Sequence, residues 1–113
     1  MDISEFNRLD NQVKYQRHPW ETSRKNVLKH FLKNTDIKFP IKRIVDIGSG
    51  DAFVLHSLLK DNLATEYFAI DTAYTPTIIK QLKQNNSNSS VVYLNNLEEY
   101  YSKYGSTENT LFL

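Results

Sequence analysis

Two carboxylates and two glycines between residues 46 and 71 have the spacing of a ligand-binding turn. Asp46 is followed by Gly48 and Gly50 at alternate positions, and Asp71 comes about 20 residues further on. Because glycine has no Cβ, Gly48 permits a sharp turn and Gly50 lets a ligand approach the backbone closely. The carboxylates can accept hydrogen bonds from an amino group or from the hydroxyls of a ribose.

Each carboxylate stands at the end of a short apolar run. Ile44–Ile47 is too short for a helix and rich in β-branched residues, which predicts a buried strand, and Glu66–Ile70 predicts a second one. After the glycines, the apolar residues of Phe53–Lys60 recur at helical spacing. Strand, glycine turn and helix form the opening of a nucleotide-binding βαβ unit. We therefore expect free N–H groups of this helix to face an anionic group in the turn.

At these residues the chain resembles the class I S-adenosylmethionine-dependent methyltransferases. Their first motif is an acidic residue followed by Gly-x-Gly-x-Gly, and it stands here as Asp46-Ile47-Gly48-Ser49-Gly50-Asp51-Ala52, with Ala52 in place of the third glycine. A dinucleotide-binding turn usually reads Gly-x-Gly-x-x-Gly, and Phe53 occupies the sixth position. This departure disfavours a nicotinamide or flavin. An acidic residue at the strand end also suits an amino group better than a pyrophosphate.

The resemblance implies S-adenosyl-L-methionine as the cofactor. Asp46 and the glycine turn would hold its methionine end, Asp71 its ribose, and Asn96, or its neighbour Asn95, the adenine amino group. The implied cofactor-binding residues are Asp46, Gly48, Ser49, Gly50, Asp51, Asp71, Thr72, Asn96 and Leu97. The competing interpretations are a purely structural glycine turn and an ordinary loop asparagine at Asn96.

A helix is predicted before the first strand, from Pro19 to Lys33. Its predicted buried face consists of Trp20, Val27, Leu28, Phe31 and Leu32, with lysines and arginines on the outer face. The resemblance implies that such a helix covers the pocket, where Arg17 or Arg24 would meet the carboxylate of the ligand and Trp20 would close the pocket. The plainer interpretation is that Trp20 packs on the sheet and both arginines are solvated.

The remaining elements follow from caps and apolar runs. Thr75-Pro76 predicts a helix start, Val91–Leu94 a third strand, Leu97–Tyr104 a helix, and Thr110 the start of a fourth strand. Together they predict an α/β fold, and the resemblance implies a Rossmann-like three-layer sandwich with a parallel sheet in the order 3-2-1-4. Since the resembling family has seven strands, we expect a domain truncated after the fourth. Residues 1–40 would form an N-terminal helical cover and residues 41–113 a half-core.

The composition narrows the classes of protein. The 113 residues are 40% hydrophobic with a net charge of +1, which predicts a single domain without the electrostatic footprint of nucleic-acid binding. No cysteine is present, so disulfides, thiolate zinc sites and thiol nucleophiles are excluded. The histidines lack metal-ligand spacing, and no metal site is predicted. A polar N-terminus and the lack of a membrane-length apolar run predict a cytoplasmic protein.

Methyl transfer from a sulfonium is a direct displacement in which orientation carries much of the rate. In the resembling family the acceptor contacts come mostly from the end of the fourth strand onward, so no catalytic residue is named and this chain alone is expected to be inactive. Near-neutral charge favours a small-molecule acceptor. Two alternatives stay open, namely a non-catalytic Rossmann-like fragment or interaction module and a dinucleotide-dependent oxidoreductase. The unprotected edge of the fourth strand predicts a homodimer.

Overall fold

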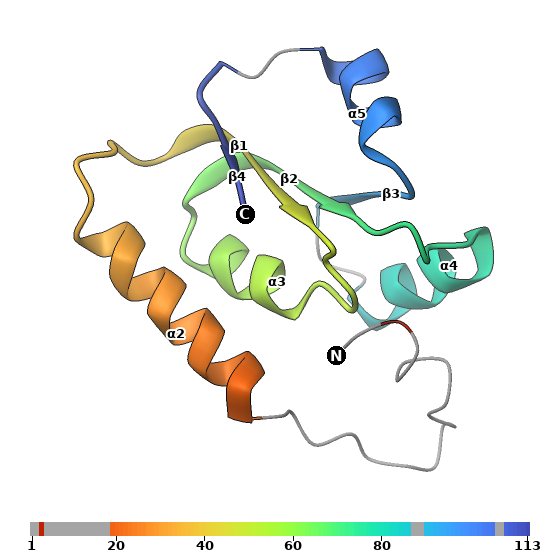
Figure 1. Ribbon diagram of the computed structural model, residues 1–113, viewed down its shortest axis with the longest axis horizontal. Coiled ribbons are helices and arrows are strands. Elements are labelled where there is room, and N and C mark those ends of the chain that lie inside the picture. Colours follow the sequence, from red (N-terminus) through yellow and green to blue (C-terminus); the bar gives the residue numbers. More distant parts are fainter. Residues whose placement is uncertain (1–2, 4–18, 87–89, 106–107) are drawn as a thin grey trace.

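The computed structural model describes residues 3, 19–86, 90–105 and 108–113. Helices and strands alternate along the chain (Figure 1). In order they are α2 (Pro19–Lys33), β1 (Ile41–Ile47), α3 (Phe53–Lys60), β2 (Ala64–Ile70), α4 (Pro76–Asn85), β3 (Val91–Leu94), α5 (Leu97–Tyr104) and β4 (Thr110–Phe112). Within these ranges every helix is too short or too polar to span a bilayer.

The four strands form one parallel sheet in the order β3-β2-β1-β4, which confirms the predicted Rossmann-like α/β arrangement. The last residues of the first three strands are in register, since Ile47 pairs with Ile70 and Ile70 with Leu94. The loops that follow β1, β2 and β3 therefore leave the sheet at the same edge. Ligands of open parallel sheets bind at this edge.

Two strands begin earlier than their apolar runs indicate. Strand β1 starts at Ile41, which pairs with Ala64, the first residue of β2. Because Lys42 and Arg43 are polar, the apolar pattern of the sequence does not indicate this part of β1. Buried Arg43 is accommodated because its Nε lies 3.3 Å from Glu66 Oε1 and its Nη1 donates to the Tyr104 carbonyl at 3.1 Å.

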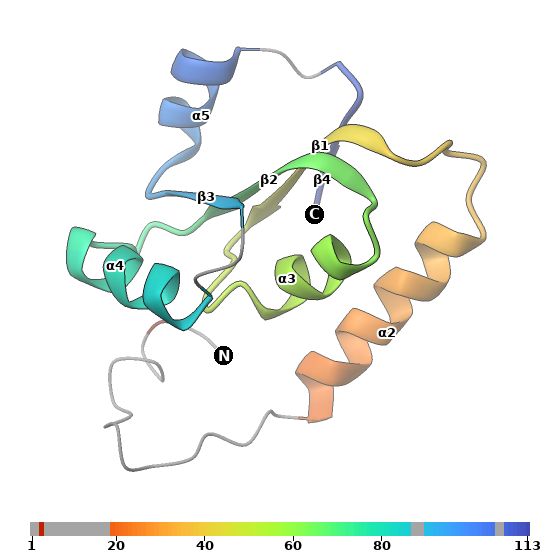
Figure 2. The same cartoon turned by 180° about the vertical axis from the view of Figure 1, so that it is seen from behind.

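Helices cover both faces of the sheet, as Figures 1 and 2 show. Helices α2, α3 and α4 contribute to one hydrophobic cluster, in which Leu55, Leu58 and Leu82 are almost fully buried. Helix α5 contributes to the cluster on the other face, where the Tyr100 ring meets the Phe68 ring edge-on at 5.1 Å between centroids. The chain thus has the three layers that the sequence predicts.

The prediction of one continuous buried face on α2 was wrong. Leu32 is buried and Leu28 partly buried, but Trp20, Val27 and Phe31 are 64%, 67% and 61% exposed. The reason is that α2 packs against α3 with one side only. Lys29 at this contact forms a salt bridge of 3.1 Å with Asp61 at the end of α3.

Replacing Tyr100, the buried aromatic residue of α5, tests how α5 packs against the sheet. Tyr100 is fully buried, so Tyr100→Ala is expected to lower the free energy of unfolding by about 3–5 kcal/mol through lost burial and a cavity. The matched control is Tyr101→Ala on the same helix, because Tyr101 is 44% exposed and its loss should cost well under half as much. Urea denaturation measures both values. Equal losses in the two variants would contradict this account of the packing.

Candidate functional site

The turn after β1 is built on residues with left-handed backbone angles. Gly48 has φ +73° and Gly50 has φ +57°, a region that glycine enters without steric cost. Ala52 also lies there, with φ 62°, and its methyl group is buried in the core. The N–H groups of Gly48 and Ser49 both donate to the Ile70 carbonyl, at 2.8 and 3.1 Å. The turn is therefore fixed to the end of β2.

Both polar groups of Gly50 are held by residues that follow β2. The Gly50 N–H donates to Asp71 Oδ2 at 3.0 Å, and the Tyr74 hydroxyl donates to the Gly50 carbonyl at 2.6 Å. Burial raises the pKa of Tyr74 far above its ordinary value, so the hydroxyl stays protonated and acts as a donor. The role of Tyr74 was missed in the sequence, where the residue has no motif to mark it.

Most amides of the turn form hydrogen bonds within the protein. Besides Gly48, Ser49 and Gly50, the Ala52 N–H donates to the Ser49 carbonyl at 2.9 Å and the Phe53 N–H to Asp51 Oδ1 at 3.3 Å. The expectation that free N–H groups of the helix after the turn face an anion was therefore wrong for Phe53, the first residue of α3. A phosphate would meet carboxylates here instead of unbonded donors.

Asp46 is the most unusual carboxylate of the site. It is 2% exposed, and its Oδ2 accepts a hydrogen bond of 3.0 Å from the Ser49 hydroxyl. Its Oδ1 accepts none from the part of the chain that the structure describes, and the closest cation is Arg24 Nη2, at 4.0 Å. Burial raises the pKa of Asp46. A buried acceptor oxygen in this state is stabilised by any ligand that brings a positively charged donor.

A small hollow opens beside this turn, with a volume of about 110 Å³. Its lining comes from α2, the glycine turn, α3 and the end of β2, namely Trp20, Glu21, Arg24, Gly48, Ser49, Gly50, Asp51, Phe53, Val54 and Asp71. The fold thus brings the predicted cover residues Trp20 and Arg24 to the predicted turn. Sites for whole cofactors usually measure roughly 300–1,000 Å³, so this hollow is sized for one end of such a ligand.

The other predicted residues do not join this hollow. Asn96 is the N-cap of α5, since its Oδ1 accepts the Glu99 N–H at 2.7 Å, and its amide donates to Asn95 Oδ1 at 2.9 Å. Leu97 packs on the α5 side of the sheet, and Thr72 is exposed in the turn after β2. Arg17 lies outside the described residues. The geometry therefore offers no support for an adenine site at Asn96.

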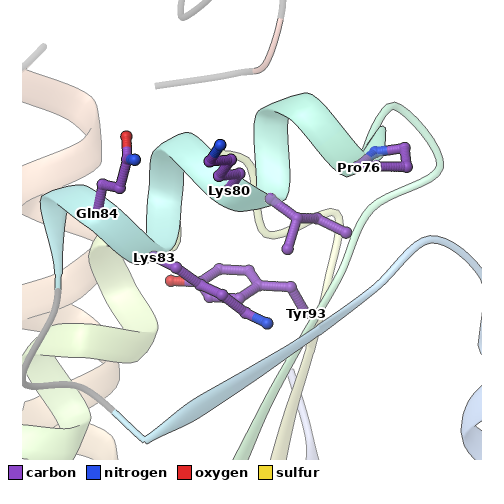
Figure 3. A pocket seen from close by; sticks show the side chains of 6 residues that line it. Pro76, Lys80, Lys83, Gln84 and Tyr93 are labelled. Carbon is purple, nitrogen blue, oxygen red and sulfur yellow. The ribbon is translucent and has the colours of Figure 1, made fainter.

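A larger hollow lies between α4 and β3, away from the glycine turn (Figure 3). Its volume is about 780 Å³, and it is an open surface groove lined by Pro76, Ile79, Lys80, Lys83, Gln84 and Tyr93. The Tyr93 hydroxyl lies 3.1 Å from His56 Nε2, and burial lowers the pKa of this histidine. The groove shares no lining residue with the hollow at Asp71. Among the described residues no group of three or more His, Cys, Asp or Glu side chains could hold a metal ion.

Comparison with known proteins adds little to this geometry. No protein-family model matches the chain, and no curated protein matches it. Among solved structures, the chain is similar to a chain of the complex between the Haloferax volcanii Trm112 methyltransferase activator and a candidate methyltransferase. The TM-score is 0.45 and the identity 16%, over 73% of this chain and 40% of that one. The chain thus spans less than half of that neighbour, and a likeness this weak carries no argument about function.

The burial of Asp46 gives a prediction on stability. Its raised pKa means that the folded protein holds this proton more tightly than the unfolded chain does, so the stability it contributes is complete below the ordinary aspartate pKa. This contribution is lost as pH rises through the raised pKa of the folded state. Asp46→Asn cannot ionise and should be more stable than the wild type at neutral pH.

Thermal unfolding across the acid range measures this difference. The gain from Asp46→Asn should shrink as pH falls below the ordinary aspartate range, because both proteins are then neutral at this position. Asp36→Asn, an exposed carboxylate in the connector before β1, serves as the control and should change little at any pH. A variant that is less stable than the wild type at neutral pH would refute this reading of Asp46.

Proposed function

We propose that this chain binds S-adenosyl-L-methionine at the turn after β1 and forms the cofactor-binding part of a methyltransferase. The observation that carries the proposal is the buried Asp46, which keeps an acceptor oxygen without a hydrogen bond from the described residues beside a glycine turn. The α-ammonium group of an amino-acid ligand would supply the missing donor. A second carboxylate, Asp71, stands at the end of the neighbouring strand, where a ribose would lie.

The charge around the turn favours this ligand over a dinucleotide. Asp46, Asp51 and Asp71 surround a turn most of whose amides are already bonded, and burial, together with the negative charge of Asp71, raises the pKa of Asp46. A pyrophosphate would be repelled by these carboxylates. S-adenosylmethionine carries an ammonium and a sulfonium, and both positive charges would be attracted. A dinucleotide-dependent oxidoreductase is therefore the second candidate.

Each end of the ligand has a candidate partner in the hollow. Asp71 Oδ2 accepts the Gly50 N–H and Oδ1 accepts the Ala73 N–H at 2.9 Å, and each oxygen keeps a second lone pair for a ribose hydroxyl. Arg24, 45% exposed at its side chain, can turn from Asp46 to the ligand carboxylate. Trp20 and Phe53 supply aromatic surface near the sulfonium.

In the reaction, this chain would position the cofactor. S-adenosylmethionine supplies an electrophilic methyl group when it is bound, and the transfer needs the methyl carbon aligned between sulfur and acceptor. A turn fixed to β2 through Gly48, Ser49 and Gly50 provides a rigid base for that alignment. In this proposal residues 1–40 form the cover and residues 41–113 the cofactor-binding half-core. The acceptor is a small molecule, and no residue is assigned to it.

Calorimetric titration tests the proposal with S-adenosylhomocysteine, the demethylated product, and with NADH. We expect heat of binding with the first and none with the second. The competing oxidoreductase predicts the reverse. Binding of neither ligand would leave a non-catalytic fragment or interaction module and would reject the proposed function.

The placement of the ribose has its own test. Asp71→Ala should weaken the binding of S-adenosylhomocysteine by about 10–150-fold. This factor corresponds to the loss of a hydrogen bond to a charged group, which is worth about 1.5–3 kcal/mol. Asp71 also holds the turn, so Tyr74→Phe is the matched control. It removes the other bond to Gly50 and leaves both carboxylates in place. Equal weakening in the two variants would show that Asp71 acts through the turn instead of through the ribose.

A further inference from the structure

A second hollow lies at the opposite edge of the sheet from the glycine turn. Its volume is about 380 Å³, and its walls are the ends of α2 and α3, the connector between α2 and β1, and the residue before β2. Ile41 and Ala64, the first residues of β1 and β2, are paired, so these walls meet at the edge where both strands begin. We call this hollow the connector pocket. The seven residues of β1 separate it from the glycine turn by roughly 20 Å.

The floor of the connector pocket is apolar. Leu32 is 3% exposed and belongs to the hydrophobic cluster, against which Phe39 and Leu63 also pack. Ile37 is 40% exposed and forms part of the rim. Pockets for small molecules measure roughly 300–1,000 Å³ and combine an apolar lining with a few polar groups. The connector pocket therefore has both the size and the floor of a small-molecule site.

The polar groups of the pocket carry an unbalanced positive charge. Lys29 is paired with Asp61, at 3.1 Å between Nζ and Oδ2. Lys33 lines the same pocket, and no carboxylate of the part of the chain that the structure describes lies within ion-pair distance of its ammonium group. Thr35, which is partly buried, adds a hydroxyl that can donate a hydrogen bond. The lining thus presents one cation and one neutral donor to an occupant.

The ends of the two helices weaken this charge without cancelling it. The carboxyl end of a helix carries a partial negative charge of roughly half an elementary charge, which water screens. In α2, Asn34 reduces this effect, because its N–H donates to the Phe31 carbonyl at 3.1 Å and its side-chain amide to the His30 carbonyl at 2.8 Å. The two amides that follow α3 donate to its last carbonyls in the same way. The full charge of Lys33 therefore dominates at the pocket.

We propose that the connector pocket binds a small amphipathic anion, namely an aromatic or branched aliphatic molecule with one carboxylate. The apolar body would lie on Leu32, Phe39 and Leu63, and the carboxylate would meet the Lys33 ammonium and the Thr35 hydroxyl. A neutral apolar molecule leaves Lys33 without a counter-charge. A polyphosphate carries more charge than one lysine balances and is repelled by Asp61. A monoanion is the class of ligand that matches both the floor and the charge.

Titration of the isotope-labelled chain with 4-phenylbutyrate, followed by amide NMR shifts, is the first test. Saturable shifts are expected at Leu32, Thr35 and Leu63, and none at Gly48 or Gly50. The neutral analogue 4-phenylbutanol should bind about 5–10-fold more weakly, because it lacks the charge that meets Lys33. Acetate, which has the charge without the apolar body, should not saturate in the same concentration range.

A matched pair of lysine variants separates the role of Lys33 from general attraction of anions. Lys33→Met keeps an apolar stem without the charge and should lower the affinity for 4-phenylbutyrate by about 5–10-fold, to that of the alcohol. Lys38→Met removes another exposed lysine, which belongs to the connector and lies outside the pocket lining, and should change neither affinity. Both lysines are exposed, so both variants are expected to fold, as circular dichroism would verify.

Four outcomes would overturn the proposal. They are no saturable binding of 4-phenylbutyrate, equal binding of the acid and the alcohol, shifts centred on the glycine turn, and equal losses in the two lysine variants. Each of these measurements is made without S-adenosylhomocysteine, so the result stands whether or not the proposed cofactor binds.

Discussion

The Gly50 peptide group joins the two halves of the candidate site. Its N–H is held by Asp71 and its carbonyl by Tyr74, so the loop after β1 and the loop after β2 take up their positions together. The bond from Tyr74 is short, at 2.6 Å, and buried, so losing it would leave an unsatisfied carbonyl, and the bond to Asp71 is partly buried. Gly48, Ser49, Asp51 and Asp71, which line the hollow, all belong to these two loops.

The same connection has an electrostatic consequence. Because the protein uses most amides of the turn for its own bonds, the charge of the hollow is set by its lining carboxylates Glu21, Asp51 and Asp71, with buried Asp46 nearby. Arg24 from α2 compensates Asp46 in part, at 4.0 Å. Trp20 of the same helix also lines the hollow.

Much of the fold could be predicted because its signals are local. The β-branched residues of β1, the Thr75 cap, whose hydroxyl accepts the Ile78 N–H at 3.2 Å, and the Gly105 stop each act on adjacent backbone. The strand order was expected from the resemblance that the glycine turn carries, and the sheet confirms it. The start of β1 could not be predicted from the sequence, because Arg43 is stabilised in the sheet by Glu66 and Tyr104, which are distant in sequence.

For the candidate site, the sequence by itself determined the turn and the two strand-end carboxylates, because glycine spacing and a strand ending in aspartate are properties of neighbouring residues. Only the tertiary structure decided how these groups are used. It assigned Tyr74 to Gly50, gave Asn96 to the cap of α5, and left Phe31 exposed on a helix whose periodicity predicts burial. The physical reason is that burial and hydrogen bonding depend on which elements pack together, and a residue's own type does not encode its partner.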